Sequence, residues 1–420
     1  MLKQVDKLYQ ILLLVTALMY WGCQPKSEIS TIVNIPEIKS IPTPAKTGSG
    51  EPNLFTGHDG KVYLSWIEPI DSIQVALKFS TLENDDWAAS KTIASGSDWF
   101  VNWADFPALA VNKDGIMAAH WLLKRSEGMY DYDIYVSQSK DQGTNWSKPF
   151  ILHNDGIAAE HGFVCMIPLA DQTIFAAWLD GRNTKAPEHN DHTTNDSHAG
   201  GSMSIRAAQF DAEGLLSNEI LLDSRVCDCC QTDAALTSNG PVVVYRDRSE
   251  KEIRDIAIVR SIEGKWTEPQ VVHRDDWEIA GCPVNGPRVE AMGDHVAVAW
   301  FTGANNKNQA KLAFSSDGGA SFGPPIQIDE GKPLGRMDLL MLEDHSVMVT
   351  WMEGKDQGAE IRASQITPGG NKKASFTIAQ NSESRASGFP RMSRDQDRIY
   401  WAWTQVDSTS LVQTAYLDMI

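Results

Sequence analysis

Cysteines form the densest group of reactive side chains in this 420-residue chain. Cys227, Cys229 and Cys230 lie almost side by side, and Cys282 follows later in the chain. In an oxidising compartment such thiols form disulfides, here Cys227 with Cys282 and Cys229 with Cys230. As thiolates, the same four residues could instead bind Cu(I) or Zn²⁺. The sequence leaves both alternatives open, and it predicts no other cofactor.

Arginines and aromatic residues form a second group with potential chemistry. An arginine fork binds a carboxylate through two parallel hydrogen bonds, and aromatic faces stack on sugar rings. The candidates for such contacts are Arg182, Arg246, Arg248, Arg288, Arg336, Arg391, Asp233, Trp103 and Trp277. They predict a pocket for a carbohydrate or another small anionic ligand. The alternative for each arginine is a pairing with Asp or Glu between neighbouring structural units.

A repeated pattern predicts how these residues are positioned. A turn rich in Asp, Gly or Asn is followed, seven times, by an alternating apolar run that ends in a large aromatic residue. The aromatic anchors are Trp66, Trp121, Trp178, Tyr245, Trp300, Trp351 and Trp403. A repeat of roughly 50 residues made of strands and turns is typical of a β-propeller with four-stranded blades. We therefore expect an all-β propeller of seven blades, or of six if one repeat is an irregular extension.

The strand order within a blade determines which candidates share a face. The starts of the innermost strands, the ends of the second strands and the links between blades lie on one face, here called the working face. The arginine and aromatic candidates all fall at such positions. The seventh repeat lacks a fourth strand, and residues 31–38 have strand character. We expect this N-terminal segment to close the ring, which removes an open sheet edge.

Two predicted hairpin turns carry the pattern Ser-x-Asp-x-Gly-x-x-aromatic. They comprise Ser139, Asp141, Gly143 and Trp146 in the second repeat, and Ser315, Asp317, Gly319 and Phe322 in the fifth. Asp and Ser side chains bond the backbone of such a turn, and Gly adopts the positive φ. The turns resemble the Asp boxes of the sialidase-type, or BNR-repeat, propellers, and the resemblance covers roughly residues 50–420. In that family the boxes are structural and lie opposite the active site.

The resemblance implies an exo-acting glycoside hydrolase of the sialidase type that acts on an acidic sugar. Sialidases bind the substrate carboxylate with three arginines and use a tyrosine nucleophile, activated by a glutamate, and an aspartate as acid/base. By position, the corresponding residues are Arg288, Arg336 and Arg391 for the anion, Asp105 and Glu278 as acid/base groups, and Tyr130 or Tyr245 as nucleophile. The family's early Arg-Ile-Pro motif is missing, because Gly50-Glu51-Pro52 stands in its place.

Two other function classes stay open at this point. One is a non-catalytic propeller that binds a glycan or a protein partner. The other is a metal- or redox-linked envelope protein that uses the cluster Cys227–Cys230.

The N-terminus predicts export. Residues 1–22 have a basic start and an apolar run too short for a membrane-spanning helix, as in a signal peptide. Gly22-Cys23 resembles a bacterial lipoprotein cleavage site, so Cys23 is the predicted lipidated residue, residues 23–46 a tether and residues 47–420 a single propeller. These features predict a periplasmic or cell-surface protein that reaches the membrane only through its lipid. The net charge of −18 argues against nucleic acid as a partner, and we expect a monomer.

Overall fold

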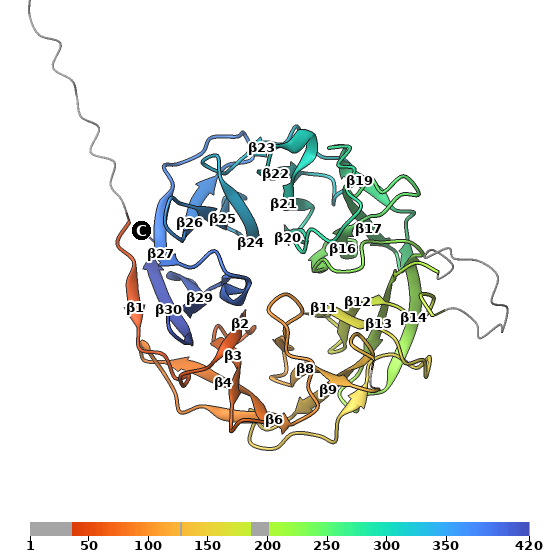
Figure 1. The fold of residues 1–420 in the computed structure, drawn as a ribbon, viewed down its shortest axis with the longest axis vertical. Helices are drawn as coiled ribbons and strands as arrows, with labels where there is room; N and C mark the ends of the chain where they lie inside the picture. The colour runs from red at the N-terminus through yellow and green to blue at the C-terminus, as the bar shows by residue number, and fades with distance from the viewer. Residues whose placement is uncertain (1–35, 127, 186–200, 420) are drawn as a thin grey trace, which may run out of the picture. The chain divides into compact units, whose positions relative to one another are not determined.

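The computed structural model describes residues 36–126, 128–185 and 201–419. This part of the chain consists of β-strands joined by turns and links, with two short 3-10 helices, η1 (Ala304–Asn306) and η2 (Arg385–Ser387). Seven antiparallel sheets of four or five strands form a ring (Figure 1). The expected seven-bladed propeller is therefore confirmed, and the six-bladed alternative is wrong. Within the described residues, no helix is long and apolar enough to cross a membrane.

In blades one to six, the strands follow one another from the centre of the ring outward. Blade one contains β2 (Gly50–Thr56), β3 (Val62–Pro69), β4 (Val75–Glu83), β5 (Asp86–Trp87) and β6 (Lys91–Gly96). Blade two contains β7 (Leu109–Val111), β8 (Met117–Lys124), β9 (Tyr132–Ser139) and β10 (Phe150–Ile151). Blade three contains β11 (His161–Pro168), β12 (Ile174–Asp180), β13 (Ser204–Phe210) and β14 (Leu216–Asp223).

The other blades repeat this order. Blade four contains β15 (Asp233–Thr237), β16 (Gly240–Arg246), β17 (Ile256–Ile262), β18 (Lys265–Trp266) and β19 (Gln270–His273). Blade five contains β20 (Arg288–Met292), β21 (His295–Thr302), β22 (Gln309–Ser315) and β23 (Ile326–Gln327). Blade six contains β24 (Pro333–Met341), β25 (Val347–Gly354), β26 (Ala359–Ile366) and β27 (Phe376–Asn381). Blade seven contains β28 (Arg391–Arg394), β29 (Arg398–Val406), β30 (Ser410–Asp418) and β1 (Lys39–Ile41).

Blade seven takes its outer strand from the N-terminal part of the chain. β1 pairs antiparallel with β30, so that Lys39 lies opposite Tyr416. The expected closure is confirmed, but its strand comprises residues 39–41 and not 31–38, of which 31–35 lie outside the described residues. The physical reason is Ile41, which is 3% exposed and packs in the core shared by blades seven and one. β1 also lies within 23–46, the range expected to act as a tether.

The seven aromatic anchors are all buried in the second strand of their blades. In three blades the indole Nε1 donates a hydrogen bond to a carboxylate two residues further along the strand. These pairs are Trp66–Glu68 at 3.0 Å, Trp178–Asp180 at 2.9 Å and Trp351–Glu353 at 2.7 Å. These three carboxylates lie at the working face, where ligands are expected. Their hydrogen bonds nevertheless have a structural role, because they hold the ends of the strands together.

The two Asp-box turns form the hydrogen bonds expected of them. In the first turn, Asp141 Oδ1 accepts a hydrogen bond from the backbone N–H of Asn145 at 2.8 Å. Ser139 Oγ accepts one from the N–H of Gly143, also at 2.8 Å. Hydrogen bonds from Asn145 hold the pKa of Asp141 at about 2. The second turn repeats this arrangement around Asp317. Both turns lie opposite the working face, between the third and fourth strands of their blades.

Gly143→Ala is expected to reduce the free energy of unfolding by about 3 kcal/mol, since positive φ and overpacking both cost energy. Gly143 has a φ of +74°, and an added Cβ would lie 2.2 Å from Cζ of Phe79 in blade one. The matched control is Gly115→Ala, where φ is +79° and no atom lies within 4 Å of the new Cβ. We expect this control to lose only about 1 kcal/mol. Urea unfolding measures both, and equal losses would contradict the role of Phe79.

Candidate functional site

Side chains from the innermost strands line a cavity of about 380 Å³ at the centre of the ring. Four of the residues predicted from the sequence line this cavity, namely Asp105, Asp233, Arg288 and Arg391. The charged residues of the lining include Asp105, Asp233, Arg288, Glu290, Asp338 and Arg391. The volume lies in the range of small-ligand pockets and suits a single sugar ring.

Carboxylates balance most of the positive charge in this cavity. Arg288 Nε lies 2.9 Å from Asp338 Oδ1 and 3.3 Å from Asp233 Oδ2. Arg391 differs, because its buried Nε has no hydrogen-bond partner among the described residues, and Asp338 Oδ2 lies 3.6 Å away. Burial lowers the pKa of Arg391, and burial raises the pKa of Glu290 to about 8. The Nε of Arg391 could therefore bind a ligand in this cavity.

Part of the link between β6 and β7 reaches toward the centre of the ring (Figure 1), and we call its residues 102–106 the roof. Ala104, Asp105 and Phe106 of the roof line the cavity. Gln231 Nε2 donates a hydrogen bond of 2.7 Å to the carbonyl of Ala104. The Trp103 ring stacks on Phe389 with centroids 5.8 Å apart. Arg336 lies 5.0 Å over the Trp103 ring and donates to two backbone carbonyls of the link before β28. Trp103 and Arg336, candidates for ligand binding, thus hold the roof in place.

Beside the roof, a tyrosine hydroxyl lies between two carboxyl groups. Tyr132 Oη is 3.0 Å from Asp105 Oδ2 and 3.0 Å from Glu160 Oε1. Asp105 Oδ1 also accepts a hydrogen bond of 2.6 Å from the N–H of Phe163. Burial raises the pKa of Asp105 to about 7 and the pKa of Glu160 to about 8. Both groups therefore titrate near neutral pH, where one can be an acid while the other is a base.

Backbone features of blades two and three bring these three side chains together. Tyr132 begins β9, and its ring stacks on Phe100 at a centroid distance of 4.2 Å. The Tyr132 N–H donates to the carbonyl of Ala159, which fixes the link that carries Glu160. Gly162 allows the close approach, because a Cβ there would lie 2.0 Å from Asp105 Oδ2.

The structure places the other candidate catalytic residues away from this arrangement. Tyr130 is exposed, and Glu278 is exposed in the link before β20. Tyr245 is fully buried and donates a hydrogen bond of 2.7 Å to Asp223. Sequence reasoning chose neither Tyr132 nor Glu160 as a catalytic residue, and neither belongs to a motif. For Glu160 the available signal was its position in a link between blades, whereas Asp105 was chosen as the start of an innermost strand.

A pH dependence of stability follows from the buried Asp105. Its pKa of about 7 compares with an ordinary value of 3.8, so between these pH values the carboxyl is protonated in the folded state and ionised in the unfolded chain. Unfolding then releases a proton, and the folded state loses up to about 4 kcal/mol as the pH rises from 4 to 7.

Asp105→Asn is expected to remove this part of the pH slope in chemical denaturation curves. Asp141→Asn is the control, because its pKa of about 2 lies below the window. If the free energy of unfolding of the Asp105→Asn variant keeps the same slope with pH, Asp105 is not the group that causes it.

Two further arginine candidates make their contacts within the protein. Arg246 is 2% exposed and donates four hydrogen bonds to backbone carbonyls in blades four and five. Its guanidinium lies 5.0 Å over the ring of Trp277. Arg248 pairs with Asp228 at 3.1 Å and with Glu252 at 2.9 Å. These contacts occupy the guanidinium N–H groups of Arg246 and Arg248 that a ligand would need.

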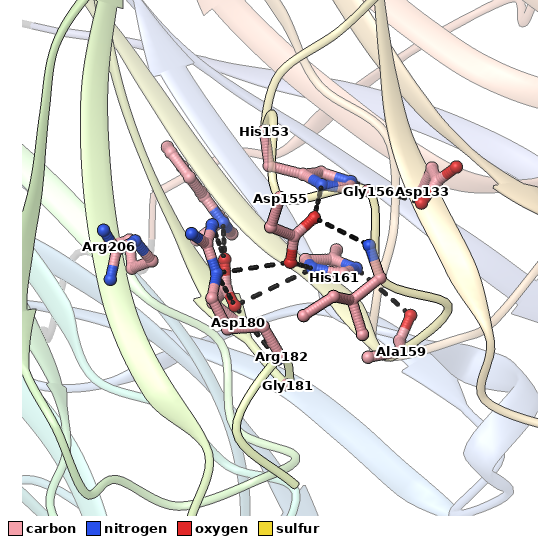
Figure 2. A network of polar contacts seen from close by, with 12 residues as sticks. Asp133, His153, Asp155, Gly156, Ala159, His161, Asp180, Gly181, Arg182 and Arg206 are labelled. Atoms are coloured by element: carbon pink, nitrogen blue, oxygen red, sulfur yellow. Dashed lines mark hydrogen bonds and ion pairs between the residues drawn. The ribbon is translucent and has the colours of Figure 1, made fainter. Parts of the chain in front are cut away.

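Arg182 belongs to a network of histidines and aspartates between blades two and three (Figure 2). The rings of His153 and His161 stack at 3.7 Å with an angle of 5° between their planes. The Asp155 carboxylate forms hydrogen bonds with His153 Nδ1 at 2.9 Å and with His161 Nε2 at 3.0 Å. Arg182 lies 2.7 Å from Asp180 and 3.2 Å from Asp155. Since these groups bind one another, we interpret the network as a structural contact between the blades.

Four cysteines meet on the working face as free thiols. Cys227 Sγ lies 3.4 Å from Cys230 Sγ, and the sulfur atoms of Cys227, Cys229 and Cys230 all lie within 4.8 Å of one another. The turn at residues 227–230 brings Cys227 close to Cys230. The disulfides Cys227–Cys282 and Cys229–Cys230 stay a prediction, as does the alternative of a metal site. Hydrogen bonds from Cys229 and Cys230 lower the pKa of the Cys227 thiol.

Comparisons with known proteins support the fold. No protein-family model and no curated protein matches the sequence. A protein of unknown function from Dyadobacter fermentans DSM 18053 is similar in structure, with a TM-score of 0.53 and 14% identity over 92% of this chain and 99% of that chain. Polysaccharide lyase Uly1 has a TM-score of 0.51 and 10% identity over 88% and 90% of the two chains. The NanB sialidase from Streptococcus pneumoniae has a TM-score of 0.46 and 12% identity over 94% and 73%.

Proposed function

We propose that this propeller is a carbohydrate-acting enzyme, an exo-acting glycoside hydrolase for a glycan that ends in an acidic sugar. The observation that carries the proposal is the Tyr132 hydroxyl held 3.0 Å from both Asp105 and Glu160. A hydroxyl between two carboxyl groups that titrate near neutral pH suits nucleophilic and acid/base work. The propeller of polysaccharide lyase Uly1 supports a glycan as the class of substrate.

The proposed reaction gives each of these groups a role. Tyr132 Oη attacks the anomeric carbon while Asp105, the carboxyl with the lower pKa, takes the hydroxyl proton. Glu160 donates its proton to the leaving oxygen as the glycosidic bond breaks. In the second step Glu160 takes a proton from water as the water oxygen attacks the anomeric carbon. The bond between that carbon and Tyr132 Oη breaks, and Asp105 returns its proton to the tyrosine oxygen. Since Tyr132 is buried, the sugar reaches it when the roof moves aside.

The acidic group of the sugar is assigned to Arg391. This guanidinium lines the same cavity as Asp105, and its Nε has no hydrogen-bond partner among the described residues. A bound carboxylate would supply the partner that Arg391 lacks.

Hydrolysis of 4-methylumbelliferyl sialic acid and of 4-methylumbelliferyl glucuronide by the purified chain tests the proposal. We expect turnover of one of them, and Arg391→Met should lower kcat/KM by roughly 100-fold. Arg248→Met is the control and should leave kcat/KM unchanged, because Arg248 is paired with Asp228 and Glu252. Absence of turnover on both substrates and on a panel of acidic glycans would overturn the proposal.

A second candidate function is a propeller that binds a glycan or a protein without catalysis. The roof favours it, because Gln231 and Phe389 hold residues 102–106 in place while the Tyr132 side chain is buried. This alternative predicts saturable binding of an acidic glycan by calorimetry, with no product released.

We also propose that the chain is an exported lipoprotein that works as a monomer, with no nucleic-acid partner. Cys23 lies outside the described residues, and the proposal rests on its place after the apolar N-terminal run. Cys23→Ala is expected to move the protein from the membrane fraction to the soluble fraction of expressing bacteria. Retention of that variant in the membrane fraction would contradict lipidation at this residue.

A further inference from the structure

We propose that Cys227, Cys229 and Cys230, with Cys282 beside them, bind one soft d10 metal ion, Zn²⁺ or Cu(I). The sulfur atoms of the first three lie within 4.8 Å of one another, and Cys227 Sγ lies 3.4 Å from Cys230 Sγ. Sulfurs that bind one Zn²⁺ tetrahedrally at about 2.3 Å lie about 3.8 Å apart. The thiols therefore already have nearly the spacing that a shared metal ion requires.

Two links of the working face hold the thiols in place. Residues 227–230 form a turn between β14 and β15, and the N–H of Cys227 donates to the carbonyl of Arg246 at 3.0 Å. Cys282 lies in the link between β19 and β20. The side chain of Gln231 joins the two links, since its Oε1 accepts a hydrogen bond of 2.9 Å from the N–H of Gly286. The ligands are thus arranged before any metal arrives.

A metal site needs buried ligands and a route by which the ion can enter, and the cysteines offer both. Cys227 and Cys230 are 1% and 2% exposed, which shields a bound ion from water. Cys282 is exposed, so the cluster has an access route from the working face. Cys165 is the remaining described cysteine, and it lies apart from the cluster in β11.

A buried arginine, Arg254, contacts the cluster and suits the negative charge that such a site would carry. Zn²⁺ with four thiolates and Cu(I) with three thiolates both have a double negative charge. Arg254 Nη1 donates to Cys227 Sγ at 3.2 Å. The backbone carbonyl of Arg246 accepts a hydrogen bond from the Cys227 N–H, which fixes the cysteine backbone. The Arg254 guanidinium also pairs with Glu252 at 2.8 Å, so it joins a carboxylate and a cysteine sulfur. Its hydrogen bond to Cys227 would stabilise a thiolate at that position.

Metal titration of the full chain tests this proposal independently of the glycosidase activity. Protein purified with a phosphine reductant and without chelators is titrated with Zn²⁺ alone against a chromophoric chelator, and with Cu(I) alone against bathocuproine disulfonate. We expect one equivalent of one of the two metals per chain. Cys230→Ser should weaken its binding by roughly 100-fold or more, whereas Cys165→Ser, the control, should leave it unchanged. Binding far below one equivalent for both metals, or binding unaffected by Cys230→Ser, would overturn the proposal.

A second measurement decides the matter if Cys230→Ser does not fold. Wild-type protein is alkylated with iodoacetamide with and without the added metal, and the peptides are identified by mass spectrometry. Protection of Cys227, Cys229 and Cys230 by the metal is the expected result. Disulfide-linked peptides among these residues in protein isolated without reductant, or equal alkylation in both samples, would contradict the site.

Discussion

Tyr132→Phe is expected to lower kcat by roughly 10³-fold while the fold stays intact. The substitution removes only the hydroxyl that lies 3.0 Å from Asp105 and from Glu160. The ring keeps its stack on Phe100 at 4.2 Å, so packing around it is preserved. Because the proposed role lies in the transition state, KM should change little. Steady-state kinetics on the fluorogenic substrate, with circular dichroism of both proteins, measure these effects.

Tyr135→Phe provides the matched control for this experiment. Tyr135 lies in the same strand, β9, and packs near Trp121. Loss of its hydroxyl should leave kcat within a factor of about two. A Tyr132→Phe variant that keeps more than a tenth of the activity would remove the tyrosine from the mechanism, leaving Asp105 and Glu160 as the reacting pair.

Arg246→Met is expected to destabilise the fold by about 4 kcal/mol. The guanidinium is 2% exposed and donates to the backbone carbonyls of Asn285, Arg254 and Phe301. Methionine fills much of the volume but leaves these carbonyls without partners in a buried place. Guanidinium chloride or urea unfolding of the purified variant gives the size of the loss.

Arg248→Met is the control for this loss of stability. Arg248 pairs with Asp228 and Glu252 near the surface, where such pairs contribute less than about 1 kcal/mol. A small effect in the control and a large one in Arg246→Met would assign Arg246 to the fold. Similar small losses in both variants would contradict that assignment and leave Arg246 available for a ligand.

The ring itself was predictable because each blade repeats the same local physics. An anchor such as Trp178 must be buried in every blade, and turns such as Ser139–Trp146 bond mainly to their own backbone. The start of the closing strand was not predictable in this way. Its place depends on where Ile41 meets the core of blades seven and one, a contact distant in sequence.

The candidate site was less predictable, since its chemistry depends on contacts between blades. Arg246 and Arg391 look alike in the sequence. The first is saturated by backbone carbonyls, whereas the buried Nε of the second has no partner among the described residues. Glu160 gains its role only because Gly162 allows Asp105 and Tyr132 to approach. No local sequence pattern predicts these contacts between blades.

Because β1 pairs with β30, the described propeller begins and ends in neighbouring strands of the same blade. Lys39 lies opposite Tyr416, and its Nζ lies 2.7 Å from Asp418, so the first and last strands begin and end side by side. A short linker from Asp418 to Lys39 could therefore join them, and new termini could be opened in an exposed turn such as that at Gly264. The blades would keep their neighbours in such a circular permutant, so their cyclic order, not the position of the ends, determines the architecture.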